Sequence, residues 1–137
     1  MTNEIITTVP ADLSQYNNAA NLVDIRRHAD LFPRVGTFTL PEITARLEPF
    51  VYGAFLYRGQ ETNPTTLRFI ASALASEIMA DRKWGMRQIT FNEIGYAIRN
   101  AVLGESTLYG VSVASLYNAI LDYLRGEGHD ADKKARQ

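Results

Sequence analysis

The chain has no cysteine and no long hydrophobic run in its 137 residues. The absence of cysteine excludes disulfide bonds, cysteine nucleophiles and cysteine-ligated metals, and it agrees with the reducing cytoplasm. No stretch approaches the roughly 20 consecutive apolar residues of a membrane helix, so we expect no membrane partner. The opening sequence MTNEIITTVPADLSQ also lacks the basic and apolar regions of a signal peptide.

An excess of positive charge is missing as well. Lysine and arginine number 14 against 15 aspartate and glutamate residues, which gives a net charge of −1. Such a balance provides no general attraction to nucleic acid or to anionic lipid. Any nucleic-acid binding would therefore need a local basic patch.

The residues that usually carry catalysis are scarce. The two histidines, His28 and His129, lie far apart and have no second ligand at H-E-x-x-H spacing. The chain has no phosphate-binding glycine loop and no G-x-S-x-G motif. We therefore predict a protein that is not an enzyme, with no catalytic residues, no metal site and no cofactor.

The composition is that of a folded protein, with 46% hydrophobic and 21% charged residues. Its length suits one domain with a single core. Residues 1–16 predict a flexible N-terminal arm, and residues 17–125 a helical domain. The last stretch, GEGHDADKKARQ at 126–137, is charged and predicts a disordered tail.

The most regular pattern lies between Ile89 and Leu124. Thr90 and Glu93 have the spacing of a capping box, and Gly104 is placed to end the helix that follows. Ser112 predicts the start of a second helix, which stops at Gly126. The apolar stripes of the two helices are Phe91, Ile94, Ile98, Ala101 and Val102, then Val113, Leu116, Tyr117, Ile120, Leu121 and Leu124.

Three further helices are predicted upstream. The first runs from Asn17 or Asn18 to Asp30, and the second from Thr39 to Tyr57 with a kink or break near Glu48, caused by Pro49. The third opens at Asn63-Pro64. VGTFTL at 35–40 is the only passable strand. We expect an all-α, single-domain bundle of about five helices, the last two packed antiparallel.

One basic and aromatic cluster is a candidate nucleic-acid site. Arg82, Lys83 and Arg87 surround Trp84, and Arg99 could join them from the next helix. Cations beside an exposed aromatic ring suit stacking on single-stranded bases. The interpretation we favour is that Trp84 plugs the core at a helix end. A helix–turn–helix is disfavoured, because the connector is long and VSVASLYNAI contains no cation.

Three tyrosines are candidate partner-binding residues: Tyr109, Tyr117 and Tyr123. Tyrosine is enriched at protein interfaces because its ring is apolar and its hydroxyl is polar. Tyr109 in the predicted connector either fills the gap between the last two helices, which we favour, or anchors a partner.

The order Glu93-Ile94, Gly104, Tyr109-Gly110 and Tyr123-Leu124-Arg125 resembles a group of small uncharacterised helical accessory proteins. These are encoded by phages and integrative elements of gut-type bacteria. The chain departs from that pattern in having Ser-Thr-Leu before Tyr109, and Val113 in place of an aspartate. The resemblance implies a mobile-element protein in the cytoplasm of a bacterial host, acting in replication beside a helicase or its loader. It supplies no catalytic residues.

Two function classes follow from these observations. The favoured class is a non-enzymatic protein-interaction module, either a replication accessory or a component of a virus particle, with a protein partner or self-association. The alternative is a nucleic-acid-binding helical domain that uses the residues around Trp84. Near-neutral charge favours the first, since nucleic-acid affinity depends mainly on neutralising phosphates.

Overall fold

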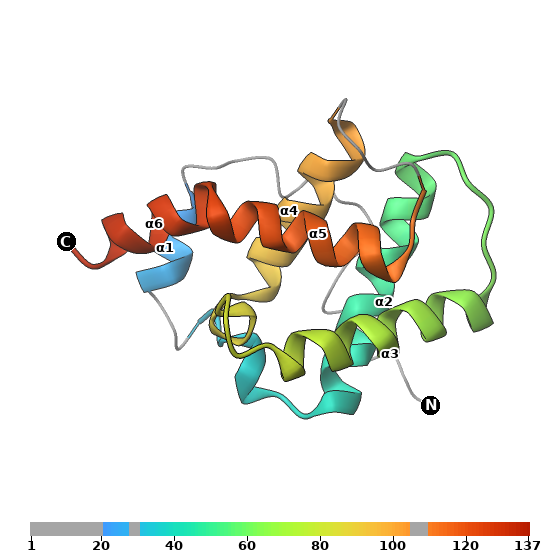
Figure 1. The fold of residues 1–137 in the computed structure, drawn as a ribbon, viewed down its shortest axis with the longest axis horizontal. Helices are drawn as coiled ribbons and strands as arrows, with labels where there is room; N and C mark the ends of the chain where they lie inside the picture. The colour runs from blue at the N-terminus through green and yellow to red at the C-terminus, as the bar shows by residue number, and fades with distance from the viewer. Residues whose placement is uncertain (1–20, 28–30, 105–109) are drawn as a thin grey trace.

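The structure, a computed structural model, describes residues 21–27, 31–104 and 110–137. Within these residues the fold is all-α, as the sequence predicts. Six α-helices and two short 3₁₀ turns follow one another along the described chain (Figure 1). Their bounds are α1 Asn21–Arg27, η3 Val35–Thr37, α2 Leu40–Tyr57, α3 Pro64–Ala80, η4 Met86–Gln88, α4 Phe91–Leu103, α5 Val113–Arg125 and α6 Glu127–Ala135.

Local capping fixes where these helices begin. Thr39 and Thr90 form the predicted capping boxes with the glutamate three residues later, and the Asn63 side chain accepts a hydrogen bond from the Thr66 N–H at 2.9 Å. Ser112 caps α5 in the same way. Helix α2 continues through Pro49 without a break. Each cap satisfies backbone N–H groups that the first turn leaves free.

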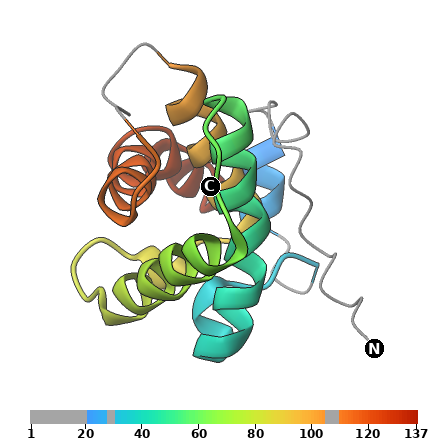
Figure 2. The ribbon, with the colours of Figure 1, turned by 90° about the vertical axis from the view of Figure 1, so that its right-hand side faces the viewer.

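The main core lies where α2, α3, α4 and α5 meet. Its fully buried large side chains come from all four helices and from the turns between them: Ile43, Leu47, Phe50, Leu74, Ile78, Met86, Ile89, Ile94, Ile98, Leu116 and Ile120. Alanine at positions 71 and 75 of α3 is also fully buried, and such small side chains allow close helix approach. Figure 2 shows α5 nearly end-on beside α4, with α3 below it.

Helix α5 crosses α4 in Figure 1, and in Figure 2 α5 is seen end-on while α4 is not, whereas the sequence analysis expected the two to run antiparallel. The contacts of α5 are not limited to α4. It packs on α4 and on α3, and it continues almost directly into α6. Crossed packing is common in globular proteins, because the side-chain ridges of one helix fit the grooves of its neighbour at an angle.

The charged segment after Gly126 is helical, which corrects the prediction of a disordered tail at 126–137. Helix α6 packs against α1 and α5, and it buries only Gly128 and Ala131. A Cβ on Gly128 would lie 2.6 Å from Cε2 of Tyr123, so glycine is needed for this close approach. With so little apolar surface, α6 has no hydrophobic stripe that a sequence pattern could detect.

The segment 35–40 is not a strand. Val35–Thr37 form η3, and the only extended pairing in the described chain is an isolated bridge between Arg34 and Thr90. The Val35 N–H donates to the Ile89 carbonyl at 2.8 Å, and Val35 is fully buried. The segment therefore joins the turn before α2 to the turn before α4. None of the described helices is long and apolar enough to cross a membrane.

Candidate partner-binding site

The turn that carries Trp84 is built around Asp81, the residue that ends α3. Its carboxylate accepts hydrogen bonds from the N–H groups of Lys83 at 3.3 Å, Trp84 at 3.1 Å and Met86 at 3.0 Å. Burial raises the pKa of Asp81, but these N–H groups outweigh that effect and hold the pKa below its ordinary value. A single carboxylate thus fixes the loop on which the Trp84 side chain lies.

Two cations lie over the indole ring. Lys83 Nζ is 4.8 Å and Arg125 Cζ is 5.2 Å from the ring centroid, both within the range of a cation–π contact. Arg82 is exposed beside them, and its guanidinium donates to the Met79 and Asp81 carbonyls. We define the Trp84 patch as Arg82, Lys83, Trp84 and Arg125. Trp84 is partly buried against the main core, so the predicted core contact and the basic patch are both present.

Two residues of the predicted basic cluster lie elsewhere. Arg87 packs beside η3, since a Cβ added to Gly36 would lie only 2.9 Å from the Cβ of Arg87. Arg99 is on α4 near Tyr96, whose pKa is raised by burial and by Glu127 and only partly offset by the Arg99 charge, and no cation–π contact among the described residues joins Arg99 to Trp84. Arg125 replaces them. The helix pattern could have indicated this position, because Arg125 ends α5 directly after a buried turn.

The candidate tyrosines have different environments. Tyr123 is only 6% exposed, and its hydroxyl donates to Glu93 Oε1 at 2.6 Å, so it cannot anchor a partner at the surface. Tyr117 is half-buried on the outside of α5; burial first, then Asp81 and Glu77, raise its pKa. Tyr109 lies outside the described residues.

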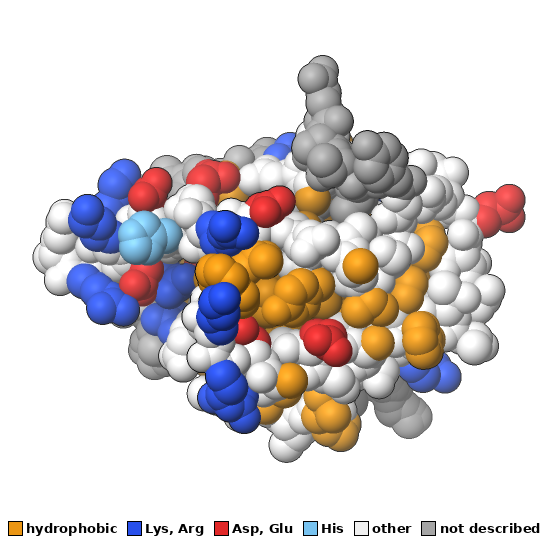
Figure 3. Space-filling view, in the orientation of Figure 1, with side chains coloured by type: hydrophobic (Ala, Val, Ile, Leu, Met, Phe, Trp, Pro, Cys, Tyr) orange, Lys and Arg blue, Asp and Glu red, His pale blue; other side chains and the backbone are white. Residues whose placement is uncertain are grey.

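Beside its buried face, α5 carries a second apolar row that is partly buried against the main core. Leu116, Ala119, Ile120 and Tyr123 are buried, whereas Val113, Tyr117, Leu121 and Leu124 are half-buried at the same helical spacing. We name these four residues the α5 outer stripe. Figure 3 shows hydrophobic side chains gathered over α5 and α3, with lysine and arginine side chains along one edge. The sequence places all these residues on one face but does not show which half faces outward.

Other exposed apolar side chains lie off the helix stripes, and the sequence analysis did not single them out. Phe69 on α3 is 68% exposed, and Tyr52 and Leu56 on α2 are 41% and 54% exposed. A large apolar residue next to a helix stripe, as Phe69 is beside Ile70, is the signal that could have found them. No cation contact borders these three residues among the described interactions, unlike the Trp84 patch.

A polar cluster is buried where α1, α4, α5 and α6 meet. The fully buried Glu93 accepts from Arg26 Nε and from the Tyr123 hydroxyl, both at 2.6 Å, as well as from the Thr90 cap. Arg26 also donates to Asp132 of α6 at 3.0 Å. The sequence predicted Glu93 only as a capping residue. Its ion pair with Arg26 and its hydrogen bond from Tyr123 join positions 67 and 30 residues apart, which no local pattern reveals.

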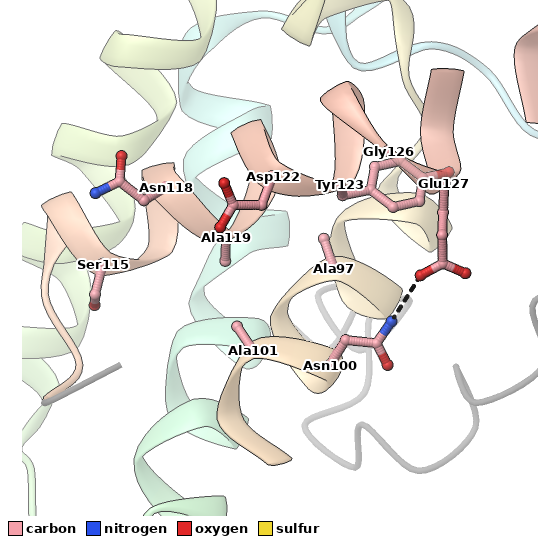
Figure 4. A pocket seen from close by; sticks show the side chains of 10 residues that line it. All are labelled: Ala97, Asn100, Ala101, Ser115, Asn118, Ala119, Asp122, Tyr123, Gly126 and Glu127. Carbon is pink, nitrogen blue, oxygen red and sulfur yellow. Dashed lines mark hydrogen bonds between the residues drawn. The ribbon is translucent and has the colours of Figure 1, made fainter. Parts of the chain in front are cut away.

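A groove of about 400 Å³ lies between α4 and α5 (Figure 4). Ala97, Ala101 and Ala119 form its small apolar floor, and the Asn100 amide donates to Glu127 across one end at 3.4 Å. No group of three or more metal-binding side chains occurs in the part of the chain that the structure describes.

Comparison of the chain with protein-family models, with curated proteins and with solved structures finds no match. Function must therefore be argued from the chemistry of the surface itself.

Proposed function

We propose that this protein is a non-enzymatic protein-interaction module that binds its partner through the α5 outer stripe and the Trp84 patch. The observation that carries the proposal is the continuity of these two features. A half-buried apolar row along α5 ends at Leu124 and Arg125, where Arg125 and Lys83 lie over Trp84. Apolar surface bordered by charge is characteristic of a protein interface.

The chemistry of this surface specifies the partner. Residues at positions 113, 117, 121 and 124 repeat along one side of a helix for three turns, which matches the groove-facing row of an amphipathic helix. The cations Lys83 and Arg125 lie at one end of that row, where both contact the Trp84 ring. The expected partner segment is therefore helical, with apolar residues at i, i+3 and i+4 and with carboxylates at one end.

Single-stranded nucleic acid is the competing ligand of the same surface. Bases stack on the open face of an aromatic ring, and phosphates attract cations. Here the two cations nearest Trp84 lie against the ring itself, at 4.8 and 5.2 Å from its centroid. A base would have to displace them, which favours a carboxylate-bearing peptide over a stacked base.

The resemblance carried by Gly104, Tyr109-Gly110 and Tyr123-Leu124-Arg125 supports a setting for this interaction. Under the proposal the module serves a phage or integrative element, either beside a replicative helicase or within a virus particle. The partner would then be another protein of that element or of its bacterial host.

The test is a selection of displayed random peptides against the immobilised full chain. Wild-type protein should enrich helical sequences with an apolar row and acidic residues at one end. The double variant Lys83→Glu, Arg125→Glu should enrich peptides with basic instead of acidic residues at that end, because the charge of the site is reversed. Phe69→Ser is the matched control, since it removes an exposed apolar side chain away from the patch and should leave the selected sequences unchanged.

Several outcomes would contradict the proposal. No enrichment, or enrichment that Phe69→Ser removes and the charge reversal does not, would place the interface elsewhere. Salt-sensitive binding of unmodified single-stranded DNA that exceeds peptide binding would instead support the nucleic-acid alternative.

A further inference from the structure

A second pocket, of about 390 Å³, opens on the other side of Trp84. Its walls come from α1 and the chain after it, from the turn around Gly85, from the end of α5, and from α6. Trp84 and Leu124 form its apolar side. The volume lies within the range of small-molecule sites and is much larger than a single water or ion requires.

Three arginines and one aspartate line this pocket. The Arg26 side chain is only 8% exposed, and Asp132 accepts from both Arg26 and Arg136 at 3.0 Å. Asp132 is thus shared by two cations. Glu93, the other partner of Arg26, is fully buried and does not line the pocket.

Arg34 adds a positive charge that no described carboxylate neutralises. Its guanidinium donates to two main-chain carbonyls, those of Arg26 at 2.5 Å and Phe32 at 3.5 Å. Within the described residues, no aspartate or glutamate forms an ion pair with it. The carbonyls hold the guanidinium in place, while its charge remains available to a ligand.

These features together match an organic phosphate. A phosphate monoester has three terminal oxygens and up to two negative charges, which suit the several N–H donors of Arg34 and Arg136 and the imidazole of His129. A carboxylate has one charge and two oxygens and would leave most of these donors unused. The remaining volume beside Trp84 and Leu124 accommodates an apolar or planar body.

We infer that this pocket binds a small organic phosphate of nucleoside-monophosphate size, with the phosphate at Arg34 and Arg136 and the body against Trp84 and Leu124. The pocket shares Trp84 and Leu124 with the proposed partner surface, but its charged residues belong to α1, to the chain after α1 and to α6, so Arg34 and Arg136 can be changed without altering the partner surface.

The only tryptophan of the chain reports binding directly, since it lines the pocket. Tryptophan fluorescence of the full protein is followed during titration with adenosine monophosphate, inorganic phosphate, adenosine and acetate. Adenosine monophosphate should give a saturable change and bind more tightly than inorganic phosphate, while adenosine and acetate should bind weakly. Arg136→Gln should weaken the binding about tenfold, as expected for a charge-assisted contact.

Lys133→Gln is the matched control, because it removes the same charge from an exposed position of α6 that does not line the pocket. It should leave the affinity unchanged. Arg34→Gln, checked by its thermal unfolding, should weaken binding at least as much as Arg136→Gln. Arg136 is largely exposed, so its substitution tests the site without threatening the fold.

Four results would overturn the inference: no saturable change with any phosphate, equal affinity for acetate, equal loss in Lys133→Gln and Arg136→Gln, or equal affinity for adenosine and its monophosphate. Tighter binding of an unphosphorylated single-stranded oligonucleotide would likewise overturn it, in favour of a nucleic-acid strand.

Discussion

The main core and the junction of α1 with α4, α5 and α6 bury side chains of opposite character. The main core contains fully buried aliphatic residues such as Leu74, Ile98 and Ile120. The junction has a small apolar cluster and, beside it, the buried Glu93 with its ion pair to Arg26. The main core can be stabilised by apolar area alone, whereas the junction depends on satisfying a buried charge.

The same contrast appears in what each region leaves at the surface. The main core leaves the α5 outer stripe and the Trp84 patch half-exposed. The junction leaves the arginine-lined pocket between α6 and the chain after α1. An apolar surface suits a protein partner, and a cationic pocket suits a small anion. The two regions therefore predict two different ligands.

The largest expected effect is in the main core. Leu116→Ala or Ile120→Ala should lower the free energy of unfolding by about 2–5 kcal/mol, because each removes a fully buried side chain. Urea unfolding followed by circular dichroism measures the loss. Leu121→Ala, on the half-buried side of the same helix, should cost clearly less. Equal effects at positions 116 and 121 would contradict the assignment of the inner and outer sides of α5.

The junction should respond most strongly to Glu93→Gln. This change keeps the size of the side chain but removes the charge that Arg26 and Tyr123 contact, and it should cost about 2–3 kcal/mol. A double-mutant cycle with Arg26→Gln measures the coupling between the two charges. Strictly additive losses would show that the ion pair does not stabilise the junction.

Gly128→Ala should disturb α6 while leaving the main core intact. The new methyl group would meet the Tyr123 ring, and the crowding, partly offset by alanine's helix propensity, should cost about 1–2 kcal/mol. Amide hydrogen exchange should rise in residues 127–135 and in α1, but not in α3. Unchanged exchange in α6 would mean that the close contact between Gly128 and Tyr123 does not hold α6 against the rest of the fold.

The smallest effect is expected for Tyr123→Phe, about 1 kcal/mol at neutral pH, for the lost hydrogen bond. Its pH dependence is more informative. Burial, followed by the charge of Glu93, raises the pKa of Tyr123 far above its ordinary value of 10.0. Above about pH 10 the unfolded chain loses this proton and the folded chain keeps it, so wild-type stability should fall as the pH rises.

The free energy of unfolding of Tyr123→Phe should fall less steeply with pH than that of wild type over this range. The variant lacks the hydroxyl proton that the folded wild-type chain keeps and the unfolded chain loses. Guanidinium unfolding at a series of alkaline pH values gives both slopes. Parallel slopes would show that Tyr123 ionises normally in the folded protein.

The sequence predicted the main core well because its rules are local. The caps at Thr39, Asn63, Thr90 and Ser112 each act within four residues. The apolar stripes that follow face the core, although Val113, Tyr117, Leu121 and Leu124 of the predicted α5 stripe are only half-buried. The all-α fold class is confirmed on the same grounds.

The junction could not be predicted in this way. Helix α6 contributes only Gly128 and Ala131 to the interior, and its ionic contact to Arg26 spans 106 residues of sequence. A charged segment with almost no apolar side chains resembles a disordered tail until its distant partners are known.

The Trp84 patch contains both a local contact, which the sequence predicts, and a contact between residues distant in sequence, which it does not. Lys83 and Trp84 are neighbours in sequence and were predicted together, but Arg125 reaches the ring from the end of another helix. Arg87 was grouped with them by nearness in sequence, and Arg99 as a residue that could join from the next helix, but Arg87 lies beside η3 and Arg99 lies near Tyr96 on α4.

The central claim is that the α5 outer stripe and the Trp84 patch bind an apolar, acidic-ended helix, and a charge-swap titration tests it most directly. Calorimetry compares wild type and Lys83→Glu, Arg125→Glu against one selected peptide and against its copy with lysine in place of the acidic residues. The account predicts that each protein binds only the peptide of opposite charge, with comparable affinity for the two matched pairs. Equal binding of both peptides by both proteins would contradict it.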